Sequence, residues 1–188
     1  QSLNVSPDTM LIGSVGRFNE YKDYRGFVLA AADLASADSR AYFLMVGRDI
    51  DSENSTLMQW IEETGFSDRF RLLGERNDVP EIFAAMDIFC LHSKSEGFPN
   101  VLGEAMCSGL PSVVTDVGDA AVLLGNAGLI VQPQDIEGMT KGLLTLVQST
   151  SETRAALGNI ARKRIQENYS IEAIKLQYEE LYQKVLSK

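Results

Sequence analysis

The most constraining feature of this sequence is a strand–loop–helix unit at residues 87–111. Residues 87–91 (Asp-Ile-Phe-Cys-Leu) form a short apolar run, which is typical of a buried parallel strand. The polar loop that follows leads to Pro99, which suits the first turn of a helix because no backbone donor is needed there. We predict that this helix has Asn100 as its N-cap and runs to about residue 108, where a Gly and then a Pro end it.

The rest of the chain repeats this alternation of apolar strands and helices. Further strands are expected at residues 10–16, 41–47, 70–74, 112–115 and 128–131. Helices are expected at residues 24–37, 53–64, 79–85, 136–147, 151–168 and 170–186. This alternation predicts an α/β fold with a doubly wound, Rossmann-like parallel sheet that is covered on both faces. Ligands of such sheets bind beyond the carboxyl ends of the strands, which here means loops 16–22, 47–51, 74–78 and 93–100.

Composition excludes several classes of function. The chain has 188 residues, and its net charge of -9 argues against broad nucleic-acid binding and against a polybasic membrane surface. Cys90 and Cys107 fall in a predicted strand and helix, so we expect both to be reduced and buried. With His92 as the single histidine, no His-based metal site is expected. No signal peptide and no membrane-spanning apolar run is recognised, which predicts a cytoplasmic protein.

The loop and helix at residues 93–108 have the chemistry of a ligand site. The first turn of a helix offers unpaired N–H groups and a positive dipole end to a phosphate. Gly97 lets backbone approach a ligand closely, and Glu96 and Glu104 are suited to accept hydrogen bonds from sugar hydroxyls. From this spacing alone, a capped helix with two solvated glutamates is an equally good interpretation.

Residues 96–114, Glu-Gly-Phe-Pro-Asn-Val-Leu-Gly-Glu-Ala-Met-Cys-Ser-Gly-Leu-Pro-Ser-Val-Val, resemble the signature of retaining glycosyltransferases of family 4. That signature has two Glu separated by seven residues, then Ala-Met or Ala-Ala, a small residue, Gly, any residue, Pro and a Val-rich strand. The rest of the chain also resembles the C-terminal, donor-binding domain of these two-domain (group 1, GT-B) enzymes. The resemblance implies that the donor is a nucleotide diphosphate sugar.

The resemblance also implies roles for single residues. Arg17 and Lys22, which follow Gly16, would hold the donor diphosphate, where a guanidinium fork and a point charge both suit phosphate oxygens. Glu96 would lie near the donor sugar, and Glu104 would accept both ribose hydroxyls. The backbone donors to sugar and phosphate would come from Gly97, Phe98, Asn100, Val101 and Leu102.

The remaining correspondences are less specific. Arg76 would lie beside the base and Val79 near the edge of the base, although a polar turn leading into a helix explains that loop almost as well. Gly47 would leave room for the nucleotide. Residues 115–119 (Thr-Asp-Val-Gly-Asp) depart from the family's commoner double-glycine form, so no acidic contact is assigned to them.

Two other motifs point to different chemistry. Asp49-Ile50-Asp51 has the spacing of a metal-binding Asp-x-Asp, but we interpret it as a solvated loop and assign no metal site. Gly13 and Gly16 faintly suggest a dinucleotide fingerprint, but a third glycine is missing and no acidic residue ends the second strand. A nicotinamide enzyme is therefore rejected.

These observations lead to a prediction for the whole chain. We expect a lead-in or linker at residues 1–9, a nucleotide-sugar-binding domain at 10–169, and a terminal helix at 170–188 that packs toward an N-terminal acceptor domain outside this chain. The expected activity is retaining sugar transfer from a UDP-, GDP- or ADP-sugar to a glycan or lipid-linked saccharide, without metal or other cofactor. The isolated chain should not turn over an acceptor. Any peripheral membrane association at the cytoplasmic face would arise through that N-terminal domain. A non-catalytic sugar-nucleotide-binding module and a phosphorylase-like enzyme remain alternatives.

Overall fold

The computed structural model describes residue 6 and residues 8–187, and within these residues the core is one six-stranded parallel sheet. The strands lie in the order β3-β2-β1-β4-β5-β6, and every neighbouring pair is parallel. This order reverses between β1 and β4, which is the topological switch point of a doubly wound sheet. The predicted fold class is therefore confirmed. The predicted lead-in at residues 1–9 lies mostly outside the described residues.

The strands are short and closely match the apolar runs in the sequence. Their bounds are β1 Met10–Val15, β2 Ala41–Val46, β3 Phe70–Leu72, β4 Ile88–Leu91, β5 Ser112–Thr115 and β6 Gly128–Val131. The register pairs Met10 with Ala41 across β1 and β2, and Ile12 with Ile88 across β1 and β4. The central strands are buried on both faces, which is why they read as continuous apolar runs.

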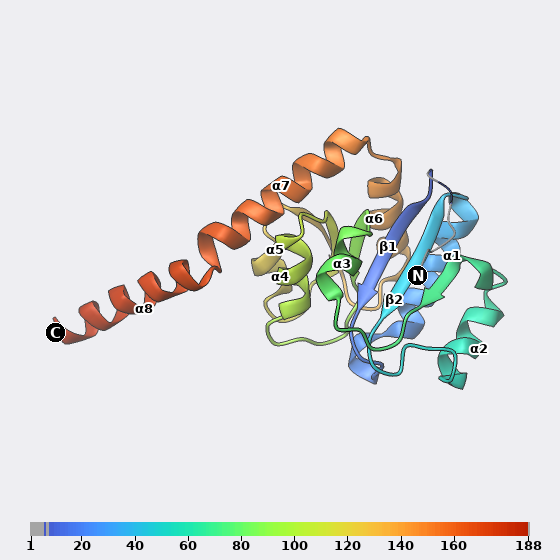
Figure 1. Ribbon diagram of the computed structural model, residues 1–188, viewed down its shortest axis with the longest axis horizontal. Coiled ribbons are helices and arrows are strands. Elements are labelled where there is room, and N and C mark those ends of the chain that lie inside the picture. Colours follow the sequence, from blue (N-terminus) through green and yellow to red (C-terminus); the bar gives the residue numbers. More distant parts are fainter. Residues whose placement is uncertain (1–5, 7, 188) are drawn as a thin grey trace.

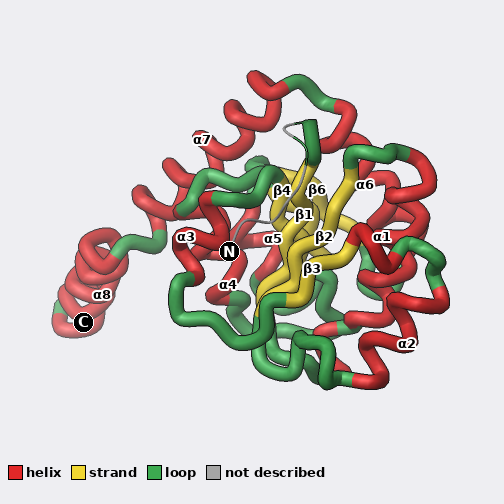
Figure 2. The backbone as a smooth tube through the Cα atoms, turned by 45° about the vertical axis from the view of Figure 1, so that its right-hand side comes forward, coloured by secondary structure: helices red, strands yellow, loops and turns green. Residues whose placement is uncertain are grey.

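Helices cover both faces of the sheet (Figures 1 and 2). One face packs against α1 (Tyr24–Ala37), α2 (Ser55–Glu63) and α6 (Ile136–Gln148). The other packs against α3 (Val79–Ala84), α4 (Asn100–Cys107), α5 (Ala120–Leu124) and part of α7 (Ser151–Asn168). Alternate residues of one strand enter opposite cores: Ile12 packs with the first group and Leu11 with the second. The carboxyl ends of the strands are thereby held on a rigid frame.

Three details of the sequence interpretation are wrong. Asn100 is the first residue of α4 rather than its N-cap, because Pro99 occupies the cap position and makes no side-chain capping bond. Helix α5 was not predicted, since only five residues form it after a turn at Gly118. Cys107 is exposed, because it lies at the end of α4 on the side away from the sheet, whereas Cys90 is buried as expected.

The last helix, α8 (Ile171–Leu186), projects away from the body of the molecule (Figure 1). None of its described residues is buried, and a row of large apolar side chains is exposed along it: Leu176, Tyr178, Leu181, Tyr182 and Val185. A helix docked along its whole length on its own domain would bury one face, and α8 does not. Among the described residues, no helix combines the length and the apolar character needed to cross a membrane.

Candidate functional site

A cavity of about 750 Å³ lies at the carboxyl edge of the sheet, over the switch point between β1 and β4. It is formed by the loops after β1, β2, β3 and β4, together with the first turns of α4. It brings together all the site residues expected from the sequence except Phe98 and Leu102: Gly16, Arg17, Lys22, Gly47, Arg76, Val79, Glu96, Gly97, Asn100, Val101 and Glu104. Segments up to 88 residues apart in the chain thus converge where ligands of such sheets bind.

The charged centre of this cavity is a pair formed by Lys22 and Glu96. Lys22 Nζ donates to Glu96 Oε1 at 2.6 Å, and the Ser93 hydroxyl donates to the same oxygen at 2.6 Å. Both charged side chains are largely shielded from solvent, with 19% and 14% of their surface exposed. One N–H of the ammonium therefore serves Glu96, which leaves two for an anion in the cavity.

Lys22 is positioned by a short 3₁₀ helix, η1 (Glu20–Lys22), that connects β1 to α1. Asn19 caps this turn, since its side chain accepts a hydrogen bond from the Lys22 N–H at 3.1 Å. Asp23 follows in the left-handed conformation, with φ of 53°, and is the N-cap of α1. The turn directs the lysine toward the loop after β4.

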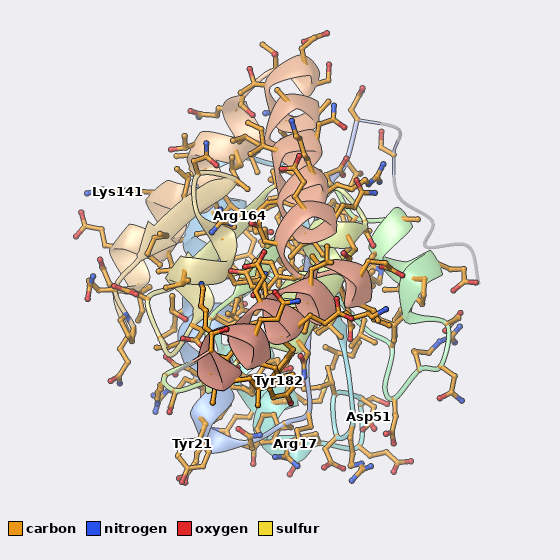
Figure 3. The ribbon with its side chains drawn as sticks, turned by 90° about the vertical axis from the view of Figure 1, so that its left-hand side faces the viewer. Arg17, Tyr21, Asp51, Lys141, Arg164 and Tyr182 are labelled. Carbon is orange, nitrogen blue, oxygen red and sulfur yellow. The ribbon has the colours of Figure 1, made fainter. Side chains whose placement is uncertain are left out.

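Arg17 supplies the second cation of the cavity. It lies on the wall of the cavity, and its exposed side chain is at the lower end of the molecule in Figure 3, the same end as Tyr21 and Asp51. No ion pair formed by the described residues includes Arg17. Its guanidinium can therefore bind an anion without first giving up a partner.

The start of α4 offers backbone donors to the cavity. Within the described part of the chain, the N–H groups of Gly97, Phe98 and Val101 donate no hydrogen bond. The Asn100 N–H already donates to Phe98 O at 3.0 Å, and the Leu102 N–H to Pro99 O at 2.9 Å. Three of the five expected backbone donors are therefore unused.

Two expected residues turn away from this cavity. The Leu102 side chain is fully buried in the core beneath α4. The Phe98 ring faces a second cavity between α3, α4 and α7, where it lies 6.0 Å from the Tyr169 ring. Neither residue therefore lines the first cavity.

Two glycines of the site lack a side chain for different physical reasons. A Cβ on Gly97 would meet no atom within 4 Å, so this position is open toward the cavity. A Cβ on Gly47 would lie 2.0 Å from Gly16 O, so this glycine is required first of all for the close approach of two loops of the protein itself. Gly47 also lines the cavity, and its expected role in leaving room for a nucleotide stays a prediction.

The loop after β5 supports the loop after β4, a role that the sequence interpretation missed. The Thr115 hydroxyl donates to Ser93 O at 2.8 Å, and the Asp119 N–H donates to Gly97 O at 2.9 Å. Gly118, with φ of 51°, lies so close that a Cβ there would be 2.2 Å from Glu96 O. The departure of this loop from the commoner family pattern thus still leaves it in contact with the site.

The outer rim carries charges that are paired with each other. Arg76 donates to both oxygens of Asp78, with distances of 2.7 and 2.5 Å, and Arg48 pairs with Glu75 at 3.3 Å. The hydrogen bond from Arg76 lowers the pKa of Asp78. Glu104 is exposed on the α4 side of the cavity. Among the described residues, no group of three His, Cys, Asp or Glu side chains is placed to hold a metal ion.

His92 is a buried residue beside the cavity, in contact with the backbone of Lys22, and the sequence analysis considered it only as a metal ligand. It follows β4 directly, and only 5% of its surface is exposed. Its Nδ1 contacts Lys22 O and its Nε2 lies 2.6 Å from Ser14 Oγ. Burial lowers the pKa of His92 to about 4. The signal in the sequence was a polar residue between an apolar strand and the polar loop.

The comparisons with known proteins agree on one family. Residues 1–164 match the model of the family described as glycosyl transferases group 1. The chain is 29% identical over 184 residues to N-acetyl-alpha-D-glucosaminyl L-malate synthase of Bacillus anthracis, covering 97% of this chain and 47% of that protein. The chain thus spans about half the length of the curated relatives it matches.

Solved structures show the same similarity. The sucrose-phosphate synthase of Thermosynechococcus elongatus superposes with a TM-score of 0.84 at 26% identity, over 98% of this chain and 47% of that one. The Anabaena protein HepE, solved in complex with UDP, superposes with a TM-score of 0.77 at 25% identity, over 94% of this chain and 49% of that one.

Proposed function

This chain belongs to the glycosyl transferases group 1 family, and from that premise we propose that it is the donor-binding domain of a retaining, metal-independent glycosyltransferase of family 4. The donor would be a nucleotide diphosphate sugar, held at the carboxyl edge of the sheet. The Anabaena relative HepE is solved in complex with UDP, which supports a nucleoside diphosphate as the ligand of this chain. UDP, GDP and ADP are the candidates for the leaving group.

The observation that carries the proposal is the Lys22–Glu96 pair inside the cavity. Sugar transfer breaks the bond between the anomeric carbon and the diphosphate oxygen, so negative charge grows on the diphosphate as it leaves. Lys22, with two N–H groups not engaged by Glu96, is suited to receive that charge, and Arg17 offers a planar fork for a second oxygen. Glu96, held beside Lys22, would accept hydrogen bonds from the sugar hydroxyls.

The α4 side of the cavity would hold the rest of the donor. The unused N–H groups of Gly97, Phe98 and Val101 suit phosphate and sugar oxygens at a helix start. Glu104, one helical turn farther along and exposed to the cavity, would accept the two ribose hydroxyls. Arg76 and Val79, at the far rim, would lie beside the base.

Charge compensation by these groups is the reason for proposing a reaction without a metal. Two cations and several backbone dipoles converge on the place where the diphosphate would lie, which supplies electrostatic stabilisation directly from the protein. In a retaining reaction the acceptor hydroxyl attacks the face from which the diphosphate leaves. Glu96 acts here by holding the sugar, not as a covalent nucleophile.

The acceptor would be bound by a further domain. Because the chain spans 47% of the Bacillus relative, we propose a two-domain GT-B enzyme in which the exposed face of α8 packs on an N-terminal domain. A glycan or lipid-linked saccharide is the proposed acceptor class. A cytoplasmic location, with membrane contact through the other domain, belongs to the same proposal.

Calorimetric titration of this chain with UDP, GDP and ADP in excess EDTA tests the proposal. We expect one of the three to bind with EDTA present. Lys22→Met should weaken that binding by about 10- to 100-fold, because a hydrogen bond to a charged group contributes about 1.5–3 kcal/mol.

The matched control is Lys141→Met. Lys141 pairs with Glu137 at 2.5 Å on the exposed side of α6; it does not line the cavity, and Figure 3 shows it well away from Arg17. This variant should leave the affinity unchanged. Binding that vanishes in EDTA and returns with Mn²⁺ would overturn the metal-independent mechanism. An equal loss in both lysine variants would overturn the placement of the diphosphate.

A further inference from the structure

The buried histidine beside the cavity connects three segments of the site. His92 lies between β1, through Ser14, and the turn η1, through the carbonyl of Lys22. Its ring stacks on Phe27 with ring centroids 4.6 Å apart, and the Tyr24 ring meets it edge-on at 4.9 Å. Packing on two aromatic rings leaves the imidazole a single orientation in the core.

The two partners of His92 determine its tautomer. A backbone carbonyl can only accept a hydrogen bond, so the contact with Lys22 O requires a proton on Nδ1. The ring is neutral above its lowered pKa, so Nε2 carries no proton and accepts from the Ser14 hydroxyl at 2.6 Å. Both ring nitrogens therefore have a partner: Nδ1–H donates to Lys22 O, and Nε2 accepts from Ser14.

The carbonyl that His92 holds belongs to the lysine of the charged pair. From the same residue, the ammonium reaches Glu96 at 2.6 Å across the interface between two loops. Other bonds join these loops nearby: the Lys94 N–H donates to Tyr21 O at 2.7 Å, and Lys94 Nζ lies 3.2 Å from Asp23. Lys94 is exposed, however, whereas the bond from His92 is inside the core and shielded from competing water.

We propose that His92 is a positioning residue for the reaction, which holds the backbone of Lys22 through Nδ1–H and so sets the Lys22 ammonium against Glu96 and the donor diphosphate. This inference rests on the proposed function of the cavity. A side chain whose backbone is already fixed loses less freedom when it binds an anion, so the histidine raises affinity without touching the ligand.

Paired substitutions separate positioning from simple core packing. The side-chain N–H of an asparagine falls near the place of Nδ1, whereas that of a glutamine falls near Nε2. We expect His92→Asn to keep the affinity for UDP within about threefold, and His92→Gln to weaken it by about tenfold or more. The unmodified chain is first titrated with UDP, GDP and ADP. If GDP or ADP binds better than UDP, that nucleotide replaces UDP in the titrations of the variants.

Ser14→Ala is the matched control, because it removes the other hydrogen bond of the ring and leaves the bond to Lys22 in place. It should lower the melting temperature and leave nucleotide affinity within about twofold. If nucleotide affinity instead follows the melting temperature across the three variants, His92 is a packing residue and the inference is wrong.

A spectroscopic measurement on the unmodified chain does not depend on any variant folding. His92 is the only histidine in the sequence, so ¹⁵N-histidine labelling yields the signals of one ring. At pH 7 we expect the Nδ1-protonated neutral tautomer, and saturation with the bound nucleotide should shift the Nδ1 signal more than the Nε2 signal. An Nε2-protonated ring or an imidazolium at pH 7 would contradict the inference.

The outcomes distinguish failure of the proposed function from failure of the positioning role of His92. If the unmodified chain binds none of UDP, GDP and ADP, the proposed function fails and this inference fails with it. If the unmodified chain binds a nucleotide and His92→Gln binds it equally well, only the positioning role fails.

Discussion

Replacing Gly118 with alanine tests the contact between two loops on which the geometry of the cavity depends. Gly118 has φ of 51°, and a Cβ there would lie 2.2 Å from Glu96 O and 2.3 Å from Gly97 O. Ordinary contact begins at 3.4 Å, so the loops must separate by about 1.2 Å. That movement would shift both Glu96, which pairs with Lys22, and the backbone donors at the start of α4.

Two terms contribute to the loss of folding stability expected for Gly118→Ala. The left-handed backbone conformation costs a non-glycine residue roughly 1–2 kcal/mol, and overpacking adds about 1–3 kcal/mol. We expect the free energy of unfolding to fall by about 2–5 kcal/mol. Affinity for the nucleoside diphosphate should fall by about tenfold or more, because the movement displaces the groups proposed to bind it. A tenfold fall corresponds to about 1.4 kcal/mol of binding free energy.

Gly65→Ala isolates the backbone term. Gly65 also has a left-handed conformation, with φ of 76°, but a Cβ there meets no atom within 4 Å. Urea unfolding of both variants, with calorimetric titration of the nucleotide, separates strain from displacement. We expect Gly65→Ala to lose only the backbone term and to bind normally. If the two variants lose equal stability and bind equally well, the loop after β5 does not support the site.

Three further predictions concern charge and the last helix. Burial lowers the pKa of His92 to about 4 from 6.5, so the unfolded chain takes up the proton first and stability should fall by up to about 3 kcal/mol from pH 6.5 to 4. The free energy of unfolding of His92→Asn, measured with urea, should lack this part of the pH dependence, whereas the neighbouring charged groups Asp23, Lys22 and Glu96 are present in both proteins. An unchanged pH dependence would refute the burial effect. Glu104→Gln should weaken binding of the bare nucleoside diphosphate severalfold and Glu96→Gln should hardly change it, because the proposed function gives the ribose to Glu104 and the donor sugar to Glu96. Calorimetry checks both variants, and equal losses would refute the two roles. The isolated chain should transfer no sugar to an acceptor in a product assay beside the full-length protein, because we propose that the acceptor binds to a further domain. Transfer by the isolated chain at a similar rate would refute that proposal.

Local sequence patterns determined the secondary structure and the fold class. The apolar run before Ser93 is a buried strand, helix α1 has the expected bounds, and Gly109 ends α4 with φ of 78°. These features depend on the preferences of neighbouring residues, which the sequence displays directly. Because the strands are parallel, their carboxyl ends meet at one edge, and so most of the expected site residues line one cavity. What these residues do there stays a prediction.

The tertiary structure decided which groups meet. Lys22 and Glu96 are 74 residues apart, and no local pattern predicts that they form an ion pair. The bond from His92 to the Lys22 carbonyl and the approach of Gly118 to Glu96 also depend on how separate loops pack. Asn100 has the chemistry of an N-cap, yet the packing of the preceding loop places Pro99 there instead. The exposure of Cys107 follows from the side of α4 that faces outward. Such contacts arise from strand register and loop packing across long sequence separations, which is information that propensity and periodicity do not contain.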